Sequence, residues 1–414
     1  MIPPRRAIPL LGLAFFVFFL YAVTGLSRQW RRRPQGIVPL SGLGAATTPI
    51  SYGRWNISRP DERPSRKPYA PRPHYVPGIP KAPGSTYTKM LVVPRTSEED
   101  TTWIELALPN WQSAVYEVDN PSASLHPPKN KGHEVMVYLT FIIDHYNKLP
   151  DLVAFMHSHQ FAWHNDEIFA GNAVEILDRL NPARVIREGY MNLRCTWAPG
   201  CPDWLHPGTV EENESKQEET MLAKSWGEIF PDDPIPNVLA QPCCAQFAVS
   251  RERILSVPKA RFVYYRDWLL RTELSDYISG RVWEYLWHVV FTGDNVVCPK
   301  ENVCYCDGYG VCFGGEAEYD EFRKIGRQKQ ELEEELNRWY GQAEVIEVAR
   351  LRGNLGETSD LAVPEPGLDL SLQEQIYEKQ LLQDEILANA TIRGEDPRAR
   401  ASEAGRPWKE GDGF

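Results

Sequence analysis

The sequence has no excess of positive charge. It contains 45 Lys+Arg against 56 Asp+Glu, a formal net charge of −11. Residues 316–414 alone hold 23 acidic and 13 basic residues, so the rest of the chain is close to neutral. It therefore lacks the broad basic surface that nucleic-acid binding requires. We expect no nucleic-acid partner.

Several common catalytic motifs are also missing. The chain has no Gly-x-Ser-x-Gly elbow, no Walker loop, no Gly-x-Gly-x-x-Gly turn and no His-Glu-x-x-His helix. Their absence removes the enzyme classes that are easiest to recognise, among them the α/β hydrolases, the P-loop enzymes and the zincin proteases. Any catalytic activity has to come from another set of residues.

Cysteine is absent from the first 194 and the last 102 residues. An even number confined to one region predicts disulfides formed in an oxidising compartment. A zinc knot is the alternative, but the spacing Cys298-x5-Cys304-x-Cys306-x5-Cys312 lacks paired Cys-x2-Cys knuckles. Eight cysteines permit 105 connectivities, so the pairing stays open. The eight are Cys195, Cys201, Cys243, Cys244, Cys298, Cys304, Cys306 and Cys312.

One long run that is both uncharged and strongly apolar is present, from Ala7 to Leu26. Its 20 residues are enough for a helix to cross a bilayer. We predict a cytoplasmic tail at 1–6 and a signal-anchor helix at 7–26, with a cleaved signal peptide as the alternative. More arginines follow the run than precede it, which favours the opposite orientation.

The cysteines nevertheless indicate that the C-terminal side faces an oxidising lumen. Three Asn-x-Ser/Thr sequons, at Asn56, Asn213 and Asn389, point the same way. We therefore predict a single-pass protein in a membrane of the secretory pathway.

Composition divides the remainder of the chain. Residues 27–88 are predicted to be a disordered stem, because residues 34–83 hold eleven of the 34 prolines and few aliphatic side chains. A globular domain is expected over 89–315 and a long amphipathic helix over 316–352. The acidic tail, 353–414, is predicted to contain a short helix and to be partly disordered. The apolar stripe of 322–346 could serve self-association, or pack on its own domain.

Short apolar strands alternate with amphipathic helices in the globular region. This alternation predicts an α/β fold with a mostly parallel sheet flanked by helices. The expected strands and helices, in chain order, are strand 90–93, helix 103–108, strand 114–118, helix 133–147, strand 152–156, strand 245–249, a helix after Ser250, helix 262–270 and helix 276–291.

Three histidines lie close together directly after the strand 152–156. In open α/β sheets ligands bind beyond the carboxyl ends of the strands, so this is the expected place for a site. His157 and His159 would point to one face if the strand geometry continues, and His164 could join them from the loop. The cluster could line a sugar or phosphate pocket, hold a metal, or make structural hydrogen bonds.

A second candidate lies in the segment 280–288. Glu284 and His288 are four residues apart and would share one face of a helix. A carboxylate beside an imidazole can act as a general base, although the same pair is also common as an ordinary hydrogen bond.

Several motifs in residues 90–315 resemble the domain-of-unknown-function family 3431, which is abundant in fungi. The last of them, which ends in two glycines, is the most specific. The motifs are Lys131-Gly132-His133-Glu134, Leu149-Pro150-Asp151, Phe155-Met156-His157, Gln246-Phe247-Ala248-Val249-Ser250, Trp283-Glu284-Tyr285-Leu286-Trp287-His288 and Cys304-Tyr305-Cys306-Asp307-Gly308-Tyr309-Gly310-Val311-Cys312-Phe313-Gly314-Gly315.

The layout of these motifs resembles nucleotide-sugar glycosyltransferases of the A type, and the single N-terminal anchor resembles that of Golgi glycosyltransferases. The resemblance implies Glu284 as the base that activates the acceptor. It implies Asp119 at the nucleotide and His157, His159 and His164 around the donor, with Gln160 and His288 as further substrate contacts.

The chain departs from that pattern in one respect. No Asp-x-Asp follows the strand where ligands for a metal and diphosphate are expected, and His157-Ser158-His159 stands there instead. A divalent metal is possible but not required. The alternatives to a transferase of sugar to a glycan or cell-wall precursor are a lumenal carbohydrate-binding or partner-binding module and a His-ligated metal hydrolase.

Overall fold

The computed structural model describes residues 76–352 and 363–414. Several predictions lie outside the described residues. They are the cytoplasmic tail 1–6, the membrane segment 7–26, most of the stem 27–88 and the sequon at Asn56. Within the described ranges, no helix has the length and apolar character needed to span a membrane.

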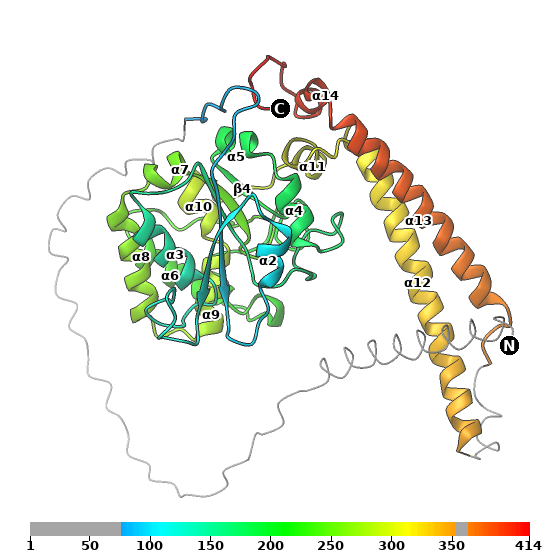
Figure 1. The fold of residues 1–414 in the computed structure, drawn as a ribbon. Coiled ribbons are helices and arrows are strands. Elements are labelled where there is room, and N and C mark those ends of the chain that lie inside the picture. The colour runs from blue at the N-terminus through cyan, green and yellow to red at the C-terminus, as the bar shows by residue number, and fades with distance from the viewer. Residues whose placement is uncertain (1–75, 353–362) are drawn as a thin grey trace, which may run out of the picture. The chain divides into compact units, whose positions relative to one another are not determined.

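A five-stranded sheet in the order β2-β1-β3-β5-β4 forms the centre of the domain (Figure 1). Neighbouring strands β2, β1 and β3 are parallel, whereas β5 runs antiparallel to both β3 and β4. The prediction of a mostly parallel sheet was therefore wrong: the sheet is mixed. The strands are β1 (Lys89–Arg95), β2 (Gln112–Glu117), β3 (Leu152–Phe155), β4 (Tyr190–Asn192) and β5 (Phe247–Ser250).

The reversed strand follows from the connection that precedes it. A helical crossover returns the chain for a parallel strand, but a long irregular segment imposes no direction. The connection formed by residues 193–246 is mostly irregular, although it contains η2 (Glu214–Lys216) and α6 (Glu219–Ile229), and β5 then enters between β3 and β4 in the opposite sense.

Helices cover both faces of the sheet, and alternating side chains of each strand supply the two cores. Val153 and Phe155 of β3 belong to one apolar cluster, while Leu152 and Ala154 belong to the other. This is the period-two alternation of a strand that is buried on both faces. The helices of the first cluster are α3 (Val135–His145), α6 (Glu219–Ile229), α7 (Arg251–Ser256), α8 (Lys259–Arg271), α9 (Asp276–Glu284) and α10 (Trp287–Thr292).

The second cluster lies on the opposite face. It joins the sheet to helices that come from distant parts of the chain. The first turns of α12 (Glu316–Leu351) add Tyr319 and Phe322 to this cluster. The helices here are α2 (Thr102–Ala107), α4 (Ala173–Arg179), α5 (Pro182–Glu188) and α11 (Glu301–Tyr309).

Helix α3 is apolar almost throughout, because it is enclosed on all sides. Residues Val135 to Ile143 are all buried, and the helix packs between the sheet and α8. The predicted helix 276–291 is instead two helices, since α9 ends at Glu284 and α10 begins at Trp287.

All eight cysteines form disulfides, which confirms the prediction made from their number and placement. The pairs are Cys195–Cys304, Cys201–Cys298, Cys243–Cys244 and Cys306–Cys312. Two of these bonds join the segment after β4 to the segment around α11, so the end of the globular domain is tied to its middle.

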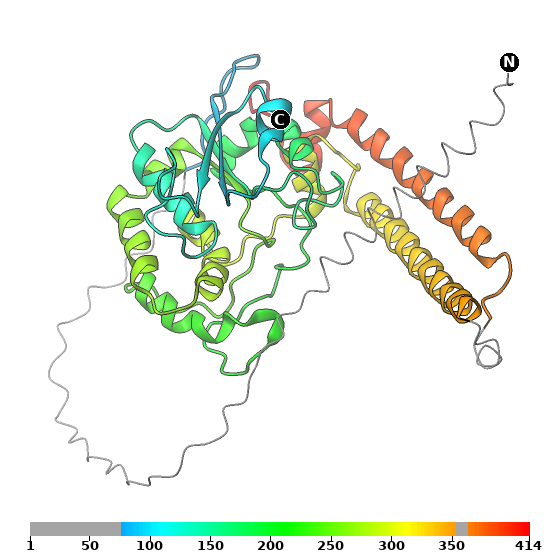
Figure 2. The ribbon, with the colours of Figure 1, turned by 60° about the horizontal axis from the view of Figure 1, so that its bottom comes forward.

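The C-terminal region forms an antiparallel pair of helices, α12 (Glu316–Leu351) and α13 (Leu368–Arg393), which lie side by side in Figures 1 and 2. Lys329 donates a hydrogen bond to Gln380, and Lys379 donates one to Gln328. Helix α12 thus packs on α13 of the same chain, and Phe322 and Ile325 at the start of the stripe predicted for 322–346 are buried. Whether copies of the chain also associate through it stays a prediction.

The segment beyond Arg393 also has structure where the sequence indicated little order. Helix α14 (Pro397–Glu403) packs on α11, and Arg187 donates a hydrogen bond to the carbonyl of Asp412. Charged residues dominate this segment, so its order comes from contacts with the domain rather than from a stripe of its own. Other elements without a sequence prediction are α4, α5, β4, η2 (Glu214–Lys216), α6 and α11.

Candidate functional site

A pocket of about 350 Å³ opens at the carboxyl ends of β1 and β3. This is the edge at which ligands bind in open α/β sheets. Four histidines and three carboxylates contribute to its wall. The lining residues are Pro94, Arg95, Thr96, Glu99, Val118, Asn130, His133, Glu134, His157, Ser158, His159, His164 and Asp276.

The turn before α3 is fixed by Asp276, the first residue of α9. Its carboxylate accepts hydrogen bonds from the backbone N–H groups of Gly132 and His133, at 2.5 and 3.2 Å. His133 has a φ of 53°, a left-handed conformation that is uncommon for a residue with a Cβ. This turn places the Glu134 side chain at the pocket rather than on the outer surface.

Glu134 and His157 are among the less exposed ionisable residues of the pocket. Their side chains are 12% and 25% exposed, and Oε2 of Glu134 lies 3.8 Å from Nε2 of His157. Burial raises the pKa of Glu134 to about 8, and the negative charges of Glu284 and Asp276 add to the rise. Burial lowers the pKa of His157 to about 3, helped by the neighbouring histidines. At neutral pH the imidazole is therefore uncharged and the carboxyl group is largely protonated.

His164 extends the cluster from the following loop. Its ring lies 4.5 Å from the ring of His157, centroid to centroid, and burial lowers its pKa to about 4. Its Nε2 is buried and has no hydrogen-bond partner in the part of the chain described. Such an atom is available to a ligand in the pocket.

His159 and Glu99 form the more exposed side. Nε2 of His159 lies 3.4 Å from Oε1 of Glu99, and Ser158 donates a hydrogen bond to the same carboxylate oxygen. Burial acts to raise the pKa of Glu99, but hydrogen bonds from Thr96 and Ser158 outweigh it and lower the pKa overall. This carboxylate is therefore ionised at neutral pH.

Gln246, just before β5, forms hydrogen bonds to the loop after β3 that carries His157, His159 and His164. Its Oε1 accepts a hydrogen bond from the backbone N–H of His157, and its Nε2 donates to Oδ1 of Asn165 at 3.0 Å. Gln246 is 2% exposed, so both bonds are made in the interior. The loop after β3 is thus fixed to the neighbouring strand, and the ring of His157 is held in position.

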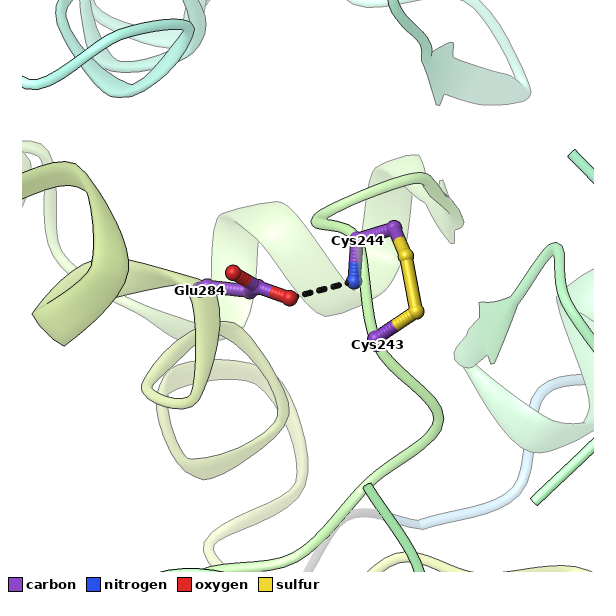
Figure 3. Close-up of side chains that lie close together, drawn as sticks. All are labelled: Cys243, Cys244 and Glu284. Atoms are coloured by element: carbon purple, nitrogen blue, oxygen red, sulfur yellow. Dashed lines mark hydrogen bonds between the residues drawn. A yellow bond between two sulfur atoms is a disulfide. The ribbon is translucent and has the colours of Figure 1, made fainter. Parts of the chain in front are cut away.

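Glu284, the predicted base, does not line the pocket. Its Oε1 accepts a hydrogen bond of 2.6 Å from the backbone N–H of Cys244, beside the Cys243–Cys244 disulfide (Figure 3). Burial raises its pKa. Cys244 has a φ of 89°, so the carboxylate stabilises a turn in a conformation that non-glycine residues rarely adopt. Its charge still acts on Glu134, and its role as a base stays a prediction.

The remaining predicted substrate contacts lie outside the pocket lining. Asp119 is exposed and accepts hydrogen bonds from the N–H and hydroxyl of Ser97, which fixes the loop that carries Glu99. His288 is fully buried, and its Nε2 bonds to the carbonyl of Asn295. The carbonyl of Gln160 accepts from the backbone N–H of Ala173. Their predicted roles with a substrate are not tested by this geometry.

A metal site is not assembled in the pocket. In the described ranges, the groups of three His, Cys, Asp or Glu donors within 4.8 Å of one another are Cys243-Cys244-Glu284 and Cys306-Cys312-Glu403. The sulfurs in both groups are bonded as disulfides, so neither offers thiolate ligands. His157, His159 and His164 would have to move to share one ion.

Sequence reasoning did not single out Glu134, Glu99, His133 or Asp276 as site residues. A usable signal existed for Glu134, because Lys131-Gly132-His133-Glu134 is a polar turn directly before a fully apolar helix. A charged residue at the start of a buried helix has to emerge into solvent or into a cavity. Asp276 lies more than 100 residues further along the chain and carries no comparable signal.

Comparison with known proteins places the chain in a family. No curated protein and no solved structure matches it significantly. One family model matches residues 91–307, which include most of β1, all of β2 to β5 and every residue that lines the pocket. The resemblance found in the sequence motifs is thereby confirmed, and the chain belongs to the family described as "Protein of unknown function (DUF3431)".

Proposed function

We propose that the protein is a glycosyltransferase-like enzyme that moves a sugar from a nucleotide-sugar donor to a glycan or cell-wall precursor, with Glu134 as its acid/base group. The observation that carries the proposal is the contact between Glu134 and His157 in a pocket at the carboxyl ends of β1 and β3. A carboxyl group with a pKa near the working pH, in a concave site, is the type of group that catalyses proton transfer.

The proposed reaction needs one proton acceptor. The acceptor hydroxyl oxygen forms a bond to the anomeric carbon of the donor, the bond from this carbon to the diphosphate oxygen breaks, and the nucleoside diphosphate leaves with the electron pair. Ionised Glu134 takes the hydroxyl proton. Because burial raises the pKa of Glu134 to about 8, the ionised form is a strong base and its population increases through the neutral range.

Neutral imidazoles suit the binding of a sugar. Each has one donor and one acceptor nitrogen, so His157 and His164 can bond to hydroxyl groups without adding positive charge. Arg95, which also lines the pocket, is a candidate contact for the diphosphate, although it forms an ion pair with Glu117 at 2.8 Å. No step of the proposed reaction passes through a metal.

The proposal includes a location. We retain the predicted membrane anchor at 7–26 and place the domain in the lumen of the secretory pathway, in the Golgi by analogy with other anchored glycosyltransferases. The four disulfides support an oxidising compartment.

The test is release of free nucleotide from a panel of nucleotide sugars by the full-length chain. We expect Glu134→Gln to reduce the rate at least about 100-fold, because the amide cannot accept the proton. Glu284→Gln tests the alternative base outside the pocket lining; because the charge of Glu284 raises the pKa of Glu134, this variant should move the pH profile of the rate to lower pH and keep most of the activity. Loss of activity in Glu284→Gln alone would assign the base to Glu284. Release from no donor, or equal rates in all three proteins, would overturn the transferase proposal.

A carbohydrate-binding module is the second candidate. It is favoured by one observation, the exposure of two aromatic side chains, Phe161 and Trp163, on the same loop as the histidines. Saturable binding of oligosaccharide without release of nucleotide from any donor would support this candidate. A His-ligated hydrolase has less support, because no three donors of the pocket meet within 4.8 Å in the described part of the chain.

A further inference from the structure

Two large aromatic side chains are exposed next to the histidine pocket. Phe161 is 65% and Trp163 is 68% exposed, and both belong to the loop between β3 and α4. Exposed apolar side chains are common singly, but two on one loop beside a pocket indicate a contact surface. Tryptophan in particular offers a large flat ring with little conformational entropy to lose on binding.

Hydrogen bonds within the loop fix its backbone, so the fold itself keeps the two aromatic side chains exposed. Gly171 has a φ of 66°, and its carbonyl accepts hydrogen bonds from the N–H of Ala162 and from Nδ2 of Asn165. An added Cβ at Gly171 would lie 2.7 Å from the carbonyl oxygen of Ala162, so only glycine allows the two sides of the loop to approach.

Buried polar groups fix the tip of the same loop. Arg194, which is 4% exposed, donates hydrogen bonds of 3.1 Å to the carbonyls of Trp163 and Asn165. Asp166 is fully buried and accepts from the N–H of Cys195 and the hydroxyl of Tyr305. The backbone under Trp163 is therefore anchored, while its ring points away from the core.

A hollow of about 450 Å³ adjoins the ring of Trp163. It is lined by Ala162, Trp163, Asn165, Glu167, Ala170 and Gly171. The hollow is open to solvent, so a ligand bound in it would rest one side against the protein and keep the other side exposed. Its one ionisable group, Glu167, is already paired with Arg194 and Arg323 at 3.1 and 2.8 Å. The hollow itself therefore offers no unpaired ionisable group, which suits a neutral ligand.

The hollow also lies close to the proposed reaction site. The ring centroids of Trp163 and His164 are 5.8 Å apart, and His164 lines the histidine pocket. A sugar ring stacked on Trp163 would therefore be a near neighbour of a sugar bound among the histidines.

We propose that Trp163 and the hollow beside it form an acceptor subsite that binds a neutral sugar unit of an oligosaccharide by stacking. The proposal deepens the proposed function, because it names the part of the acceptor that the enzyme holds while the next unit is modified.

The test is a binding measurement with the full chain and neutral oligosaccharides of two to six hexose or N-acetylhexosamine units, by titration calorimetry. We expect Trp163→Ala to weaken the affinity at least about 10-fold, in line with loss of an aromatic anchor. Trp163→Phe should restore part of it. Tyr377→Ala is the matched control, because Tyr377 is an aromatic with 63% exposure on α13. Tyr377→Ala should bind the oligosaccharides with the same affinity as the unmodified chain.

Two outcomes would overturn the subsite. One is equal affinity in Trp163→Ala and the unmodified chain, and the other is binding only of anionic oligosaccharides or of none. Folding does not complicate the result, because the ring of Trp163 is exposed and its carbonyl bond to Arg194 is made by the backbone.

The outcomes also separate this proposal from the transferase proposal. Oligosaccharide binding that depends on Trp163, without nucleotide release from any donor, supports the subsite and overturns the transferase. If nucleotide release depends on Glu134 but oligosaccharide binding is unaffected by Trp163→Ala, the transferase proposal is supported and the subsite is overturned.

Discussion

Oε2 of Glu134 and Nε2 of His157 lie 3.8 Å apart in the wall of the pocket, where both side chains are largely buried. Burial shifts the two groups in opposite directions, raising the pKa of Glu134 to about 8 and lowering that of His157 to about 3. Both therefore favour their neutral forms at neutral pH, and the pair is not an ion pair. The apolar surroundings make the charged form of either group unfavourable. The carboxyl group of Glu134 therefore keeps a proton, which it can release and take up again.

The first prediction concerns the pH dependence of stability. Unfolded Glu134 has a pKa near 4.5, so between pH 4.5 and about 8 the folded state holds a proton that the unfolded state has lost. The free energy of unfolding should therefore decrease as the pH rises through this window, by up to about 1.4 kcal/mol per pH unit from this group. Urea denaturation at pH 6 and pH 8 measures it. Glu134→Gln stays neutral and should lack this part of the decrease; equal slopes in both proteins would contradict the assigned pKa.

The same measurement at lower pH tests His157. Its pKa falls from 6.5 unfolded to about 3 folded, so below pH 6.5 the unfolded state binds a proton that the folded state excludes. Stability contributed by neutral burial of His157 is lost as the pH falls from 6.5 toward 3. His157→Gln should show a smaller loss between pH 6.5 and 4.5 than the unmodified chain. An identical loss would mean that His157 is not buried in its neutral form.

The second prediction concerns Glu284. In Glu284→Ala the N–H of Cys244, a residue only 8% exposed, loses its carboxylate partner. An unsatisfied buried donor costs about 1–3 kcal/mol, so the free energy of unfolding should fall by this amount. Glu284→Gln keeps an acceptor oxygen and should retain most of the stability. Guanidinium denaturation under non-reducing conditions compares them, and an unchanged stability in the alanine variant would contradict the structural role.

The sequence predicted the local parts of the fold well. The apolar runs that become β1, β3 and α3 are recognisable in one window of residues each, because their side chains are buried on both faces or all around. The direction of β5 was not predictable, since it depends on the path of residues 193–246 rather than on any local pattern.

The site was predictable only where its residues lie close together in the sequence. His157, His159 and His164 follow one strand and lie near one another in sequence, and the structure brings all three to one pocket. Glu134 and Asp276 reach that pocket from other elements, so only the tertiary structure brings them there. The disulfide partners of Cys195 and Cys201 are about 100 residues away, at separations of 109 and 97, and no spacing rule selects them.

The third prediction compares two disulfides that are equally buried but close loops of different length. Cys195–Cys304 spans 109 residues and Cys306–Cys312 spans six. Because Cys201–Cys298 lies inside the longer loop and stays closed, Cys195–Cys304 closes an effective loop of about 13 residues, which removes about 3 kcal/mol of unfolded-chain entropy against about 2 kcal/mol for the shorter loop. The double serine variant at 195 and 304 should therefore lose more stability than the one at 306 and 312, as measured by urea denaturation. The reverse order would show that native packing around α11, rather than loop closure, decides the effect.

The fourth prediction concerns the side of the membrane on which the domain lies. The Asn213 side chain is exposed at the start of η2, where its Oδ1 accepts hydrogen bonds from the N–H and the hydroxyl of Ser215, the last residue of the sequon. A lumenal domain should therefore carry a glycan there. Glycosidase treatment of the full chain should reduce its mass, and Asn213→Gln should remove that part of the shift. Because Gln cannot accept the glycan but conserves the amide, the variant should keep its disulfides. An unmodified Asn213 together with eight free thiols would place the domain in a reducing compartment and overturn the proposed location, whatever the outcome of the activity assays.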